Sequence, residues 1–103
     1  MESRSRRRSR SRNRERPYEI TISTADMSSK MQTFIMEQVI ECLNNRSHPK
    51  KMCRYIRERC NARYGPSWDC FVAREYYGSF AYVPRHLLGF ELNGLNFLIF
   101  KGA

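Results

Sequence analysis

Apolar positions first alternate one by one along the chain and then recur at a longer period. In residues 16–23 they stand at every second position, which predicts a first β-strand with one buried face. In residues 31–43 they stand three and four apart, which predicts an amphipathic helix. Asp26 and Ser28 precede this helix, and either side chain can cap its first turn.

A second helix with the same period follows. Ser47 can cap it, and Pro49 is tolerated in its first turn. Its apolar stripe consists of Met52, Ile56 and Cys60. Lysines and arginines fill much of the remaining surface; such a face is usually solvated, although it could also attract nucleic acid.

The period returns to two after a turn at residues 65–67. Predicted strands cover residues 68–73, 77–83, 87–92 and 95–100, and the Asn93-Gly94 pair between the last two favours a tight hairpin. The order of one strand, two helices and four strands predicts an α+β domain, with an antiparallel sheet on one side and the helices on the other.

These strands carry more large apolar side chains than two helices could cover. They occupy both faces of several strands and comprise Trp68, Phe71, Phe80, Tyr82, Leu88, Phe90, Leu92, Phe97, Leu98 and Phe100. We therefore expect a second layer from outside the chain, and a second copy is the simplest source. An uncovered aromatic strand would also be an open sheet edge, which invites another strand.

The formal net charge of +9 is unevenly distributed over the 103 residues. Eight arginines and two glutamates in residues 1–16 contribute +6, and residues 17–103 contribute +3. Self-repelling arginines without apolar neighbours cannot collapse into a core. Residues 1–17 are therefore predicted to be a disordered tail and residues 18–103 a single domain.

Three functions are open to the tail: a solvated extension, a nuclear-import signal, or a weak nonspecific contact with RNA phosphates. Its candidate nucleic-acid residues are Arg6, Arg7, Arg8 and Arg10. The tail resembles a short arginine-serine segment of the kind found in splicing factors. Phosphorylation of its serines would cancel much of the positive charge.

The sequence carries no signature of catalysis or of a bound cofactor, with no glycine-rich phosphate loop and no nucleophile beside an evident base. Its cysteines lack the close spacing that zinc sites favour, so we expect reduced, buried thiols and no metal. They are Cys42, Cys53, Cys60 and Cys70. No segment suits a membrane helix or a secretory signal, which predicts a soluble intracellular protein without a membrane partner.

Three stretches resemble the smallest, eight-kilodalton class of dynein light chains. They are ADMS at residues 25–28, YGPSWDCFVAREYYGSF at residues 64–80 and FKG at residues 100–102. The resemblance covers residues 18–103. It implies a two-fold homodimer in which residues 77–83 of each subunit join the sheet of the other.

The resemblance also implies a groove between the exchanged strand and the second helix, where an extended peptide, commonly with a Thr-Gln-Thr core, adds as a further strand. Lys50 would meet the central glutamine. The implied peptide-binding residues are Lys50, Arg74, Tyr77, Gly78, Ser79, Phe80, Ala81, Tyr82 and Val83. The implied dimer-interface residues are Asp69, Tyr77, Phe80 and Tyr82.

Several departures from the family pattern bear on these expectations. One residue is inserted around residues 75–77. Asp69 replaces a histidine near the two-fold axis, where two carboxylates would repel each other. Pro49 replaces an acidic neighbour of the groove lysine. Gly89 and Glu91 stand where pocket-lining aromatic residues are usual.

Two functions follow. The first is a noncatalytic accessory light chain of the dynein motor, or a dimeric hub, in the cytoplasm and at the cytoskeleton. Its partner would be a dynein intermediate chain or another protein with a Thr-Gln-Thr-like motif. The second is a nuclear or RNA-associated adaptor whose tail binds nucleic acid and whose domain dimerises.

Overall fold

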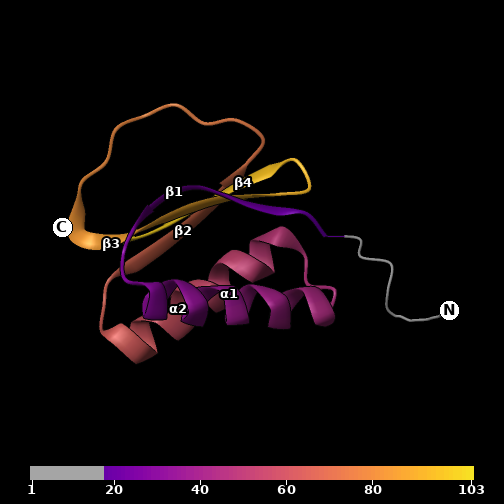
Figure 1. Cartoon of the computed structure of the whole chain (residues 1–103), viewed down its shortest axis with the longest axis horizontal. Helices are drawn as coiled ribbons and strands as arrows, with labels where there is room; N and C mark the ends of the chain where they lie inside the picture. The colour runs from indigo at the N-terminus through magenta and orange to yellow at the C-terminus, as the bar shows by residue number, and fades with distance from the viewer. Residues whose placement is uncertain (1–17) are drawn as a thin grey trace, which may run out of the picture.

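The computed structural model of the chain describes residues 18–103, so the predictions for the arginine-rich tail lie outside the described residues. Figure 1 shows the helices packed together below a twisted sheet. The elements in chain order are β1 (Ile20–Asp26), α1 (Ser29–Asn44), α2 (Pro49–Tyr64), β2 (Trp68–Ala73), β3 (Tyr82–Leu92) and β4 (Leu95–Gly102).

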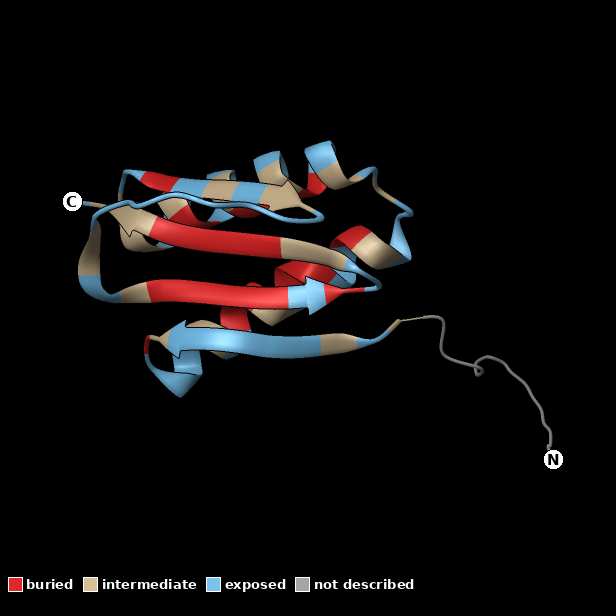
Figure 2. Ribbon diagram, turned by 90° about the horizontal axis from the view of Figure 1, so that it is seen from above, coloured by how far each residue is buried: buried red, intermediate tan, exposed pale blue. Residues whose placement is uncertain are grey.

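The four strands form one antiparallel-paired sheet in the order β1-β3-β4-β2, with both helices on one of its faces (Figures 1 and 2). The predicted α+β class is therefore confirmed. In Figure 2 the buried residues run along the two central strands, β3 and β4, whereas β1 is largely exposed. β1 and β2 are the two edges of the sheet.

The prediction of a separate strand at residues 77–83 is wrong for the single chain. Residues 74–81 carry no strand, and Tyr82 begins the long strand β3, so three strands follow the helices instead of four. Both β2 and β3 are antiparallel to β4, and they are therefore parallel to each other. Parallel strands need a crossover connection that returns along the sheet, and residues 74–81 are used for that return.

The N-cap residue of α1 is one that the sequence predicts, whereas the N-cap residue of α2 is not. Ser28 is the N-cap of α1, and its Oγ accepts from the N–H of Met31 at 3.2 Å, as predicted. The prediction of Ser47 as the cap of α2 is wrong. The cap is His48, whose Nδ1 accepts from the N–H of Lys50 at 3.2 Å, immediately before Pro49.

The core lies between the helices and the sheet, and a smaller apolar cluster lies on the opposite face of the sheet. The main core is built around side chains with no exposed surface, which include Ile35, Val39, Ile56, Cys60, Leu88, Phe90, Phe97 and Ile99. The outer cluster comprises Leu87, Leu98 and Phe100, with Tyr82 packed against it. Apolar residues therefore occupy both faces of the sheet, as predicted, and the outer ones are already partly covered.

Gly89 marks a close approach of β1 to β3. The register between these strands shifts between Ile22 and Thr24, and a Cβ atom built at Gly89 would lie 2.8 Å from Thr24 Cγ2. Glycine at this position therefore lets β1 pair closely at the bulge.

We expect Gly89→Ala to lower the free energy of unfolding by about 1–3 kcal/mol, because the added methyl group overpacks this contact. Thr24→Ser in the same chain removes the opposing methyl group and should recover most of the loss. Urea denaturation of both variants and of Thr24→Ser alone measures the coupling. Additive effects of the two substitutions would contradict the proposed contact.

Candidate functional site at the open edge of β2

The edge strand β2 is fixed from below by α2 and from one side by β4. The indole of Trp68 is buried in the core, and the N–H of the same residue donates to Asn61 Oδ1 at 2.7 Å. Cys70 and Val72 pack against the core from the same face, while Phe71 on the other face is 56% exposed. In the described chain β2 has one neighbouring strand, so its other edge is open.

Residues 74–81, here called the crossing segment, leave β2 and arch over the outer face of the sheet (Figure 1). Its aromatic side chains are unusually accessible: Tyr77 is 92% exposed, and Tyr76 and Phe80 are also exposed. Phe80 stacks on Phe100 with ring centroids 4.6 Å apart. The segment thus covers the outer cluster with one ring and presents the others to solvent.

A cavity of about 390 Å³ lies between the crossing segment and the sheet. Four of the predicted peptide-binding residues line it together, namely Tyr77, Gly78, Ser79 and Phe80. Phe71 and Phe100 form part of its opposite wall. The structure therefore brings the central predicted site residues to one place, directly beside β2.

The remaining predicted residues lie around this cavity or away from it. Lys50 is exposed in the first turn of α2 and does not line the cavity. The carbonyl of Arg74 accepts from Asn96 Nδ2 at 2.8 Å, and Asp69 is exposed on β2 opposite Phe100. Ala81 is exposed, whereas Tyr82 and Val83 are half-buried at the start of β3.

Asp26 has a role that the sequence did not reveal. Its Oδ2 accepts from Tyr82 Oη at 3.2 Å and from the N–H of Arg85 at 3.1 Å, and its Oδ1 pairs with Arg85 Nη1 at 3.5 Å. Arg85 has a positive φ of 71° inside the irregular start of β3. Asp26 therefore fixes the point where the crossing segment rejoins the sheet. The sequence signal was Pro84-Arg85, which separates the predicted strands at residues 77–83 and 87–92.

The contact between Tyr82 and Asp26 shifts the pKa of the Tyr82 phenol. Desolvation raises the pKa of Tyr82, and the hydrogen bond to the Asp26 carboxylate raises it further. The folded state then holds the phenol proton more tightly than the unfolded state, whose pKa is about 10. Its contribution to stability is full below that pH and is lost as the pH rises through the folded pKa.

We expect Asp26→Asn to lower the pKa of Tyr82, because the neutral amide no longer opposes the phenolate. Tyrosinate absorbance measured during a pH titration of the wild type, Asp26→Asn and Tyr82→Phe isolates this residue. Tyr77→Phe serves as the control for removing an exposed phenol. An identical Tyr82 titration in the wild type and Asp26→Asn would contradict the assignment.

All four cysteines are free thiols; Cys42 and Cys60 are buried, and Cys53 and Cys70 are half-buried. The hydrogen bond from Cys70 lowers the pKa of Cys53, and the same bond together with burial raises the pKa of Cys70. Burial raises the pKa of Cys60 to about 12. Among residues 18–103, no three metal-ligating side chains gather into a group, and no helix is long and apolar enough to cross a membrane.

Comparison with known families assigns the fold. The family model described as dynein light chain type 1 matches residues 19–102, which is nearly all of the described chain. The chain therefore belongs to the dynein light chain type 1 family. This family is generally noncatalytic, and its domains generally dimerise and bind peptide partners.

The solved structures that share the fold include the following three. Two are of the dynein light chain-like domain of the Fasciola hepatica calcium binding protein FhCaBP2. One is 16% identical, covers 84% of this chain and 94% of that chain, and has a TM-score of 0.73. The other, a mercury derivative, is 17% identical, covers 82% and 92%, and has a TM-score of 0.69. The DLC-like domain of CsTAL3 is 20% identical, covers 80% and 90%, and has a TM-score of 0.65.

Proposed function

We propose that this chain is a noncatalytic light chain that works as a homodimer and binds extended peptides. The proposal rests on two features of the chain that each lack a strand neighbour. They are the open edge of β2 and the aromatic crossing segment, which forms no strand. In the proposed dimer each crossing segment pairs with β2 of the other copy. Each feature then completes the other, and the exposed rings of Tyr77 and Phe80 become buried.

The peptide would add to the outer edge of the exchanged segment, beside α2 of the other copy. Main-chain hydrogen bonds would supply affinity, and side-chain pockets would supply selectivity. Gly78 and Ser79 lie in an exposed stretch of the crossing segment, where a backbone can approach closely. Lys50, exposed on α2 of the other copy, would then meet the peptide. The remaining proposed groove residues are Arg74, Ala81, Tyr82 and Val83.

The partner would be a dynein intermediate chain or another protein with a Thr-Gln-Thr-like motif, and the protein would then act in the cytoplasm and at the cytoskeleton. Two grooves on one dimer can bind two motifs at once, and this raises avidity. The two Asp69 side chains would weaken the dimer if they meet without a cation or a shared proton between them.

Sedimentation velocity of the full chain with a fluorescent Thr-Gln-Thr peptide tests the proposal. A dimer that carries the peptide supports both parts of it. A dimer that does not bind the peptide would contradict the proposed Thr-Gln-Thr preference. It would indicate that Pro49, Gly89 and Glu91 have changed the groove. A chain that stays monomeric at high concentration would overturn the proposed assembly.

The alternative function, a nuclear or RNA-associated adaptor, depends on Arg6, Arg7, Arg8 and Arg10. These residues lie outside the described part of the chain, and the alternative stays a prediction. RNA binding through them would fall steeply with salt and disappear when residues 2–16 are deleted.

A further inference from the structure

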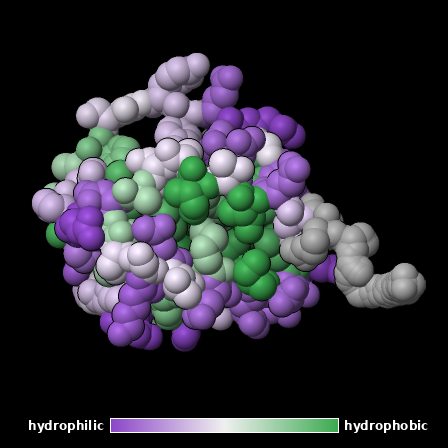
Figure 3. Space-filling model, in the orientation of Figure 1, coloured by the Kyte–Doolittle hydropathy of each residue, from purple (hydrophilic) through white to green (hydrophobic). Residues whose placement is uncertain are grey.

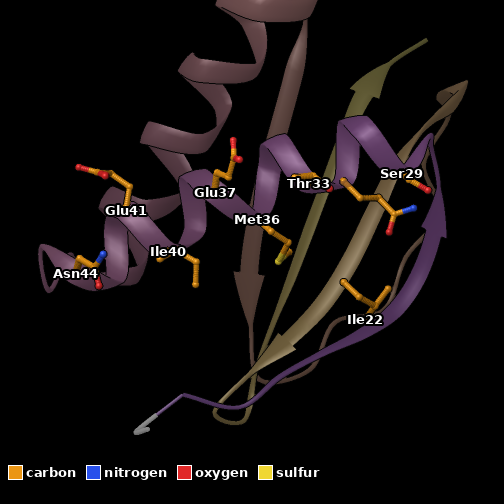
Figure 4. Close-up of a pocket in the computed structure, with 9 residues that line it drawn as sticks. Ile22, Ser29, Thr33, Met36, Glu37, Ile40, Glu41 and Asn44 are labelled. Atoms are coloured by element: carbon orange, nitrogen blue, oxygen red, sulfur yellow. The ribbon is translucent and has the colours of Figure 1, made fainter. Parts of the chain in front are cut away.

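A second groove lies at the opposite edge of the sheet, between β1 and α1; we call it the α1–β1 groove. It has a volume of about 560 Å³. Figure 4 shows Met36 and Ile40 pointing from α1 toward β1, where Ile22 lies across from them. Apolar side chains gather between these two elements on the face shown in Figure 3. The groove therefore has an apolar floor along one side of the molecule.

The floor is incompletely covered. Ile22 occupies the same face of β1 as Ile20, which packs against the main core, yet Ile22 is 42% exposed. Ile40 on α1 is 40% exposed. In the described chain β1 has β3 as its one neighbouring strand, so its outer edge is unpaired. Two exposed aliphatic side chains beside a free strand edge are a surface that an extended chain could cover.

This groove is independent of the proposed dimer. The proposed assembly uses the edge at β2, and the sheet order places β1 at the other edge, with β3 and β4 between them. The α1–β1 groove would therefore stay accessible in a dimer, and what covers it must be sought elsewhere.

The charge of the groove contrasts with that of the domain. Glu37 and Glu41, one helical turn apart, are among its lining residues, and no lysine or arginine is. Neither carboxylate forms an ion pair with another residue of the described part of the chain; Glu41 Oε2 accepts from Asn45 Nδ2 at 3.3 Å. Like charges at this spacing repel each other on a helix. An external cation near both carboxylates would relieve the repulsion.

The arginine-rich segment joins the domain beside this site. Tyr18 Oη donates to the carbonyl of Leu43 at 3.2 Å, so the chain enters the described domain at the last turn of α1. Figure 4 shows the start of β1 near the Asn44 end of the groove. All eight arginines of residues 1–16 lie just before this point.

The length of that segment is sufficient for it to turn back along the groove. Seventeen residues can extend over roughly 55 Å, whereas the sixteen residues of α1 rise by about 24 Å. The covalent link also gives the arginines a high local concentration at the groove, so weak individual ion pairs are enough for occupancy.

We propose that the arginine-rich N-terminal segment, residues 4–16, binds the α1–β1 groove of its own chain. Its guanidinium groups pair with Glu37 and Glu41, and the aliphatic parts of its side chains cover Ile22, Met36 and Ile40. The segment is then a ligand of the domain, and any nucleic acid or other polyanion that binds the arginines must compete with these carboxylates.

Backbone NMR spectra of the full chain test this inference. In a variant with all eight arginines of residues 4–16 replaced by glutamine, the amide signals of Ile22, Met36 and Ile40 should shift, whereas those of Val72 on β2 should not. When Glu37→Gln and Glu41→Gln are both present, replacing the arginines should cause much smaller shifts of these amide signals. The wild-type groove signals should move toward the glutamine variant as salt rises from about 0.05 M to 0.5 M, since screening weakens exposed ion pairs.

Glu19→Gln with Glu58→Gln is the matched control, because it removes the same charge at two exposed residues outside the groove. If the amide signals of the groove residues do not shift when the arginines are replaced, the proposal is overturned. An equal loss of response in the control variant would also overturn it, since the attraction would then be nonspecific. Groove shifts that grow with protein concentration would show binding between copies and reject the intrachain contact.

Discussion

Replacement of Trp68 by alanine is expected to lower the free energy of unfolding by about 3–5 kcal/mol, the usual loss when a buried tryptophan is truncated. The side chain is 1% exposed and lies between the rings of Tyr64 and His86, with centroids 6.0 Å and 5.6 Å away. Because small domains are stable by only about 5–15 kcal/mol, this loss would remove much of the total. It would also free β2 from α2 and remove the edge on which the proposed dimer depends.

The same residue offers a sharper test through its ring nitrogen. Trp68 Nε1 is buried and has no hydrogen-bond partner among the described residues. Burying an unpaired N–H group costs about 1–3 kcal/mol. Trp68→Phe removes this cost, but it also removes the packing of part of the indole ring. We expect Trp68→Phe to lose less than about 2 kcal/mol, well below the loss for alanine.

Urea denaturation at one protein concentration measures both variants, since the stability of a dimer depends on concentration. Tyr55→Ala, which truncates a 37% exposed ring on α2, is the control and should lose about 1 kcal/mol or less. Equal losses for phenylalanine and alanine at residue 68 would show that the indole N–H has a favourable partner.

The sequence predicted the elements whose hydrophobic period is decided locally. Both helices, the strand at residues 68–73 and the Asn93-Gly94 hairpin are present, and Asn93 and Gly94 have the expected positive φ angles of 49° and 86°. The first strand lies later than predicted, at Ile20–Asp26 instead of residues 16–23. Pairing with β3 decides where that strand begins and ends, and the pairing is not visible in the local pattern.

Contacts between distant residues explain two further differences. Asp26 was one of two candidate helix caps, whereas its carboxylate binds Tyr82 and Arg85, more than fifty residues away. The crossing segment alternates like a strand, but a single chain gives it no neighbour to pair with. A local pattern can predict that a segment is suited to a β-sheet. It does not indicate whether the neighbouring strand comes from the same chain or from another copy. The prediction for residues 77–83 therefore failed at the element that the proposed dimer shares between copies.

Phe80→Asp is expected to raise the dissociation constant of the proposed dimer by about 30- to 1,000-fold, which corresponds to about 2–4 kcal/mol for a central aromatic residue of an interface. In the single chain the ring is 43% exposed and rests on Phe100, so the substitution should cost the monomer fold far less. In the proposed dimer the same position becomes buried against the other copy, and a carboxylate there would be desolvated without a partner.

Ile40→Asp is the matched control. Ile40 is 40% exposed and is also apolar, but it lies in the α1–β1 groove, away from the crossing segment and β2. Sedimentation velocity over a range of concentrations should find the wild type and Ile40→Asp equally dimeric and Phe80→Asp monomeric, with circular dichroism showing that all three are folded. Phe80→Asp with a wild-type dissociation constant would place the interface elsewhere. A folded Phe80→Asp monomer that also loses the Thr-Gln-Thr peptide would tie peptide binding to the exchanged segment, because the proposed groove combines Lys50 of one copy with Ser79 of the other.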